Sequence, residues 1–140
     1  MSLSIRNRLR GTVVSVSIGP AMATVKVRLD GGQEITAAVT AEAVADLGLA
    51  ADSRVDALAK AGAVALATAA VKGLSIRNQL PGTVTSVTSG VAMATVRVAV
   101  AGAELTAAIT KDAVDELALA EGVPVVSLIK ATEISLANAA

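Results

Sequence analysis

The chain has 140 residues, of which 54% are hydrophobic, and it contains no aromatic residue, no cysteine and no histidine. These absences exclude disulfide bonds, thiolate chemistry, zinc sites of the Cys and His type and the commonest general base. The 12 basic and 12 acidic side chains give a formal net charge of zero, so we expect no general attraction to nucleic acid or to an anionic membrane. Any anion binding must therefore be local.

An internal repeat covers almost the whole chain. Residues 3–31 match residues 74–102 at 19 of 29 positions, and residues 34–67 match residues 104–137 at 16 of 34 positions after a one-residue gap. A repeat of this length indicates that one folding unit has been duplicated.

We predict one module over residues 1–67, a linker over residues 68–73 and a second module over residues 74–140. Each module has about 70 residues, near the lower size limit at which one hydrophobic core supports a fold. With no aromatic residue to fill that core, the modules are expected to bury their remaining apolar surface against one another and against further chains. The sequence therefore predicts an obligate oligomer.

The first module is predicted to contain five short strands and one helix. Alternation of apolar and polar residues is clean in ATVKVRL, while Val14 interrupts it in GTVVSVS. A helix is expected to begin after Thr40 and to stop near Gly48. The expected strands are residues 11–17, 23–29, 34–39, 54–59 and 64–67.

The second module repeats this order, with a helix after Thr110. A helix between the third and fourth of five strands is typical of a small Greek-key barrel of the OB type. We predict an all-β fold of two tandem OB-like five-stranded β-barrels, each with one short helix and each completed by its own fifth strand. The expected strands of the second module are residues 82–88, 95–100, 104–109, 124–129 and 134–137.

Several polar residues are kept in both modules although a barrel core does not need them. Two cations, hydroxyl groups and a helix N-terminus are the donors that a small tetrahedral oxyanion requires. Alanine stands at position 43, where a capping box would have Glu or Gln, so the first-turn N–H groups are expected to be open to an anion. The kept residues are Ser4, Arg6, Asn7, Thr40, Lys60 and Ala61, with Ser75, Arg77, Asn78, Thr110, Lys130 and Ala131.

Each of these residues also has a structural interpretation. Threonine at a helix start is most often only a cap, and Arg or Lys near a strand end is most often solvated. Asn7 and Asn78 could fix a turn, and Met22 and Met93 are expected to fill the core. Glu42 would repel a dianion near Thr40.

The motifs together resemble the Mop domain of molbindins, small proteins that bind molybdate. The resemblance rests on S-I-R-N-x-L-x-G-T-V, G-x-x-M-A-T-V, T-x-x-A-V-x-x-L-x-L and I-K-A-T-x-I-x-L, and it covers both modules. The chain is thus similar to a tandem, di-Mop molbindin of the transport-associated OB group. It contains neither a helix-turn-helix segment nor a G-x-x-x-x-G-K-[ST] loop, which related regulators and transporter ATPases carry.

The resemblance implies oxyanion sites at interfaces between modules, with the threonine of each site supplied by a different module from the lysine. It implies a trimer of six modules, with further sites on the symmetry axis whose residues the sequence does not assign. Molybdate or tungstate would be the ligand, with no catalytic residue, no cofactor and no metal bound as a cation. The implied site residues are Ser4, Arg6, Lys60 and Ala61 with Thr40 and Ala43, and Ser75, Arg77, Lys130 and Ala131 with Thr110 and Ala113.

We expect intracellular storage or homeostasis of molybdate in the cytoplasm, because no transmembrane stretch or signal peptide is recognisable. Two alternatives stay open. An OB fold can bind nucleic acid, although this chain lacks the aromatic platforms and basic groove for it. A ligand-free assembly role is the other, above all for the first module, where Gly62 stands in place of the hydroxyl of Thr132.

Overall fold

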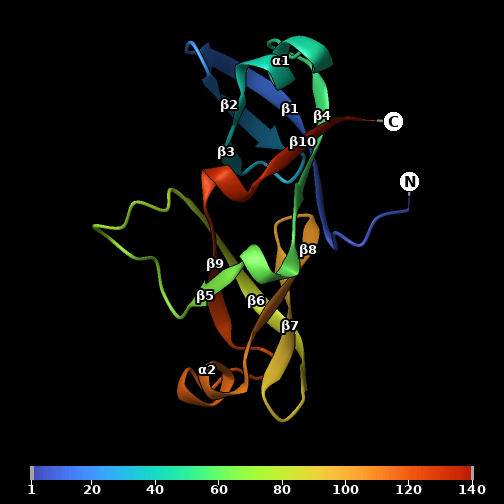
Figure 1. Cartoon of the computed structure of the whole chain (residues 1–140). Coiled ribbons are helices and arrows are strands. Elements are labelled where there is room, and N and C mark those ends of the chain that lie inside the picture. The colour runs from blue at the N-terminus through green and yellow to red at the C-terminus, as the bar shows by residue number, and fades with distance from the viewer. Residues whose placement is uncertain (1, 140) are drawn as a thin grey trace.

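The computed structural model describes residues 2–139 as two curled five-stranded sheets that lie end to end, with one short helix at each outer end (Figure 1). We call the region between the two sheets the waist. The first half contains β1 (Asn7–Ile18), β2 (Met22–Leu29), β3 (Glu34–Thr40), α1 (Ala41–Leu47), β4 (Arg54–Ala59), the 3-10 turn η1 (Ala61–Ala63) and β5 (Ala65–Ala67). The second half contains β6 (Asn78–Ser89), β7 (Met93–Val100), β8 (Ala103–Thr110), α2 (Lys111–Glu116), β9 (Pro124–Ile129), the turn η2 (Ala131–Glu133) and β10 (Ser135–Asn138). The predicted order of strands and helices is confirmed.

The last strand of each half belongs to the sheet of the other half. The sheets have the strand orders β10-β4-β1-β2-β3 and β5-β9-β6-β7-β8, all antiparallel. Ser135 pairs with Leu58 in the first sheet, and Ala65 pairs with Leu128 in the second. The expectation that each module is completed by its own fifth strand is therefore wrong, because β5 and β10 cross the waist in opposite directions (Figure 1).

The long strand β1 and its counterpart β6 each contain an irregularity in the middle. The register of β1 with β2 shifts between Val13 and Ser15, and that of β6 with β7 shifts between Val84 and Ser86. A bulge places one extra residue in the strand. This explains why Val14 breaks the alternation in the sequence and stays 38% exposed.

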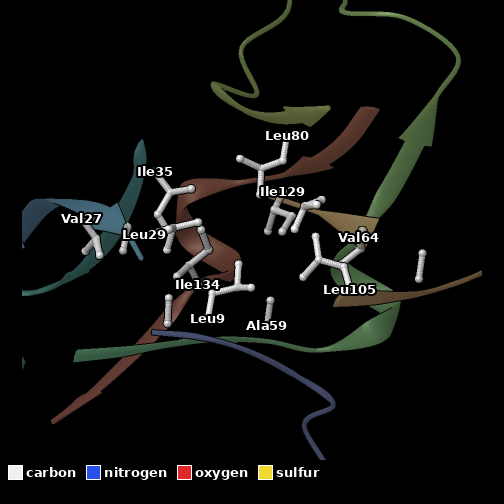
Figure 2. Close-up of a cluster of buried hydrophobic side chains, with 14 of the residues drawn as sticks. Leu9, Val27, Leu29, Ile35, Ala59, Val64, Leu80, Leu105, Ile129 and Ile134 are labelled. Atoms are coloured by element: carbon white, nitrogen blue, oxygen red, sulfur yellow. The ribbon is translucent and has the colours of Figure 1, made fainter. Parts of the chain in front are cut away.

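One hydrophobic core runs through the waist and joins the two halves. Leu9 and Ile35 of the first half lie close to Leu80 and Ile129 of the second, and Ile134 lies among them just before β10 (Figure 2). Because the chain has no aromatic side chain to enlarge a core, the halves reach a sizeable core only by sharing it. The tandem copies thus behave as one packing unit.

Two buried asparagines lock the halves together by reciprocal hydrogen bonds. Asn7 Nδ2 donates to the Thr106 carbonyl at 2.8 Å, and the Thr106 N–H donates to Asn7 Oδ1 at 2.7 Å. Asn78 makes the same pair of bonds with the backbone of Thr36, both at 2.8 Å. Each amide therefore occupies the free edge of β8 or β3 as a neighbouring strand would, and neither asparagine serves only to fix a turn.

Two hairpin turns also meet at the waist. A Cβ on Gly31 would overlap the carbonyl oxygen of Ala101, so only glycine permits this approach. Arg54 holds the adjacent Asp30 through two hydrogen bonds of 2.7 and 3.0 Å. That hydrogen bonding lowers the pKa of the Asp30 carboxyl below its ordinary value.

Met22 and Met93 do not fill the core, contrary to the expectation from the sequence. They are 49% and 53% exposed and lie at the outer end of each sheet, directly opposite Thr40 and Thr110 in the strand pairing. Ile18 is exposed in the same outer turn of the first half. Between residues 2 and 139, no helix combines the length and the apolar character of a membrane crossing.

We predict that Asn78→Ala lowers the free energy of unfolding by about 2 to 4 kcal/mol, because it leaves the N–H and the carbonyl of Thr36 without partners at the waist. Denaturant titration at one fixed protein concentration measures the loss. Asn138→Ala is the matched control, since Asn138 is exposed on β10. Equal losses in the two variants would contradict the bridging role.

A second prediction concerns a buried hydroxyl that only the second copy has. Ser127 is 0% exposed and its Oγ has no hydrogen-bond partner within the described chain, whereas the first copy has Ala57 at the equivalent position. Ser127→Ala should raise the free energy of unfolding by about 1 kcal/mol, because a buried unpaired hydroxyl is removed. The exposed Ser86→Ala should change it little. A clear destabilisation by Ser127→Ala would refute the prediction.

Candidate functional site

The strand pairing brings two of the candidate motifs together in each half. Asn7 pairs with Ala59 in the antiparallel β1–β4 ladder. Arg6 and Lys60 are the next residues of the two segments, so they lie side by side at the same end of the ladder. In the second half Asn78 pairs with Ile129, which puts Arg77 beside Lys130 in the same way. Both lysines and both arginines are exposed at the waist. Each half therefore has a pair of cations that can face a common ligand.

A 3-10 turn follows each lysine and presents backbone donors. In η1 the Ala63 N–H donates to the Lys60 carbonyl at 2.9 Å, so the N–H groups of Ala61 and Gly62 have no acceptor inside the turn. In η2 the Glu133 N–H donates to the Lys130 carbonyl at 2.9 Å, so the N–H group of Ala131 likewise has no acceptor inside the turn. Successive N–H groups of this kind suit an anion.

The lysines of both halves line one cleft at the waist. Its volume is about 530 Å³, and residues of η1, β5 and β9 line it together with Ala108 and Ile109 of β8. Lys60 and Lys130 bring positive charge to it, while Glu133 brings one negative charge. Glu133 is not among the residues kept in both copies, since the first copy has Ala63 there, and this difference is the only signal of it in the sequence.

The two arginines differ in their surroundings. The Arg6 guanidinium donates to the carbonyl oxygens of Ser4 and Leu3, so it folds back on its own exposed segment. Among the hydrogen bonds and ion pairs found for residues 2–139, none uses the Arg77 guanidinium. Arg77 is therefore the better placed of the two to donate to a ligand.

The helix-opening threonines lie away from these cations. Thr40 Oγ1 accepts from the Ala43 N–H at 3.0 Å, and Thr110 Oγ1 accepts from the Ala113 N–H at 3.1 Å. The expectation that these first-turn N–H groups are open is therefore wrong for Ala43 and Ala113. Figure 1 shows α1 and α2 at opposite ends of the molecule, whereas η1 and η2 lie toward the waist. Within residues 2–139, neither threonine is hydrogen-bonded to a lysine.

The chemistry available at the waist is that of an oxyanion site. Over residues 2–139 the structure has no group of three or more His, Cys, Asp or Glu side chains that could hold a metal ion. The donors are ammonium, guanidinium, hydroxyl and backbone N–H groups, which form charge-assisted hydrogen bonds to an anion.

The whole chain is similar to known proteins in sequence. The TOBE domain model matches residues 3–66 and again residues 74–136. The molybdenum transport protein ModE of Herbaspirillum seropedicae is 38% identical over 139 residues, and the molybdenum-pterin-binding protein MopA of Rhodobacter capsulatus is 37% identical over 139 residues. Each alignment covers 98% of this chain and 52% of the relative, so the chain spans about half the length of these proteins.

A solved structure matches over its full length. The cytoplasmic molybdate-binding protein ModG, crystallised with molybdate bound, superposes with a TM-score of 0.96 at 39% sequence identity. The match covers 99% of this chain and 100% of the ModG chain. This chain therefore belongs to the TOBE domain family, as a tandem, di-Mop member with one copy of the domain in each half of the sequence.

Proposed function

We propose that this protein binds molybdate, or tungstate, and stores the anion or keeps its cytoplasmic level steady without catalysing a reaction. The observation that carries the proposal is the waist cleft in which Lys60 and Lys130 meet beside the N–H groups of η1. The binding of molybdate by ModG, a cytoplasmic protein with the same fold along its whole length, supports it.

Each proposed site combines charged and neutral donors. In the first half these are the Lys60 ammonium, the Arg6 guanidinium, the Ser4 hydroxyl and the Ala61 N–H; in the second half they are Lys130, Arg77, Ser75 and Ala131. The tetrahedral dianion accepts hydrogen bonds on all four oxygens, and the charge of the two cations compensates that of the anion. The sequence motif and the strand pairing thus favour the same group of donors.

We propose that a second chain completes each site by supplying Thr40 and Ala43, or Thr110 and Ala113. A cleft of about 530 Å³ has room for far more than one small oxyanion, so a single chain leaves the ligand open to solvent. An N-cap hydroxyl that accepts from Ala43 still has its own proton to donate to an anion.

The outer ends of the molecule suit such a contact between chains. Met22 and Met93 expose apolar surface next to Thr40 and Thr110, and α1 is acidic while the waist cleft holds two lysines. An outer end that packs on the waist of another chain is a head-to-tail contact, and such a contact forms a ring when the rotation between successive chains closes. A trimer of six modules is the assembly that we propose on this basis.

Titration calorimetry with molybdate and sulfate tests the function. We predict that the wild type binds molybdate more tightly than sulfate and that Lys130→Ala weakens molybdate binding by about 1.5 to 3 kcal/mol, because a charge-assisted contact is lost. Lys26→Ala removes the same charge from an exposed position on β2 and should leave binding unchanged. A wild type without molybdate binding, or equal effects of the two variants, would overturn the proposal.

The two copies should differ in their affinity for molybdate, with the sites that use Lys60 weaker than the sites that use Lys130. Gly62 removes the hydroxyl that Thr132 supplies, and a Cβ at Gly62 would meet no atom within 4 Å, so a threonine fits there. Gly62→Thr should tighten the weaker class of sites by at most about 1 kcal/mol, the value of a neutral hydrogen bond. The prediction holds if a molybdate titration resolves two classes of sites in the wild type and their affinities become more alike in Gly62→Thr. Unchanged weak sites, or no binding at the first copy in either protein, would favour an assembly role for that copy.

A further inference from the structure

A glutamine holds the linker between the two copies in a fixed position. Gln79 Nε2 donates to the carbonyls of Val71 at 2.9 Å and Ile76 at 3.1 Å, while Gln79 Oε1 accepts from the Val71 N–H at 3.0 Å. The amide therefore closes the loop that projects from one side of the molecule between β5 and β6 (Figure 1). A loop closed at its base keeps its side chains near one another.

The closed loop forms a second cleft with two positive charges. Its volume is about 440 Å³, and its lining includes Lys72, Gly73, Ile76 and Arg77. The lining contains two cations and no acidic residue. Ile76 also lines the waist cleft that contains Lys130, so the two clefts adjoin.

The first copy lacks the glutamine of this arrangement. The position that corresponds to Gln79 in the repeat is Arg8, and Lys72 belongs to the linker, outside the two matched stretches. Arg6 donates to the carbonyls of its own segment, whereas the guanidinium of Arg77 makes no hydrogen bond or ion pair that we find within residues 2–139. Of the two corresponding arginines, the one in the second copy is therefore the one whose guanidinium is not already engaged with its own segment.

We propose that Lys72 is a further oxyanion-binding residue, which acts with Arg77 on the ligand of the second copy. This inference rests on the proposed binding of molybdate and adds a linker residue to that site. Lysine provides a flexible ammonium group with three donors, so it can reach an anion held by the neighbouring guanidinium. Gln79 is a positioning residue, because it holds the loop that carries Lys72.

The test is molybdate titration calorimetry on the unaltered chain and on Lys72→Met, which removes the ammonium group. The tighter class of sites should weaken about tenfold, the loss expected for one charge-assisted hydrogen bond, while the weaker class stays unchanged. Lys26→Met is the control for loss of one exposed positive charge and should leave both classes unchanged. Because Lys72 is exposed in the linker, the variant should keep the melting temperature of the wild type.

Gln79→Ala provides a second readout. It should weaken the same class of sites as Lys72→Met, and the double variant should weaken binding no further than Lys72→Met alone, because both changes act through one ammonium group. If wild-type chains bind molybdate and Lys72→Met binds it equally well at both classes, the role of Lys72 is refuted while the proposed function stands. If wild-type chains bind no molybdate, both are refuted.

Discussion

The exchange of the last strand between the two sheets is the constraint on which the rest of the structure depends. Each sheet needs β5 or β10 from the other copy to complete its five strands. The segment that leads into each exchanged strand must therefore cross the waist, and the lysine and the 3-10 turn lie on that segment. The exchange thus carries Lys60 to the β8 side of the second half, where the waist cleft forms.

The motif S-I-R-N has a structural part and a part that belongs to the proposed anion site. Its asparagine is buried and bonds to the edge strand of the other half, which fixes the end of β1 or β6 against the waist. The preceding serine and arginine are then held at the surface beside the lysine. Alternation explains this division, because successive residues of an extended chain point to opposite sides. The same motif therefore stabilises the union of the two copies and, in the proposed site, supplies anion donors.

Much of the fold could be predicted from the sequence because its signals are local. The alternation in Ala23–Leu29, the cap at Thr40 and the left-handed Gly48 each act within a few residues, and the structure has them as expected. The strand exchange could not be predicted, because β5 and β10 have the same pattern and would fit either sheet. The role of the asparagines was missed for a similar reason, since their partners lie 99 and 42 residues away along the chain.

The candidate site was predictable in part. The repeat selected Arg6, Lys60 and their counterparts, and strand pairing brings each such pair together. Glu133 and Lys72 do not stand out in the sequence, because Glu133 differs from Ala63 of the first copy and Lys72 belongs to the linker outside the repeat. The threonines cap α1 and α2, which lie at opposite ends of the molecule, so in the proposed site their contribution depends on a neighbouring molecule that one sequence cannot place.

The central claim is that two chains build each molybdate site, and a mixing experiment tests it most directly. One variant carries Lys60→Ala and Lys130→Ala, and the other carries Thr40→Ala and Thr110→Ala, so that each alone lacks one half of every site. Molybdate binding is measured by equilibrium dialysis for each variant and for oligomers that contain both. The account predicts weak binding by each variant alone and recovered binding by the mixed oligomers, because some interfaces then join an intact lysine half to an intact threonine half. Mixed oligomers that bind no better than the separate variants would contradict it.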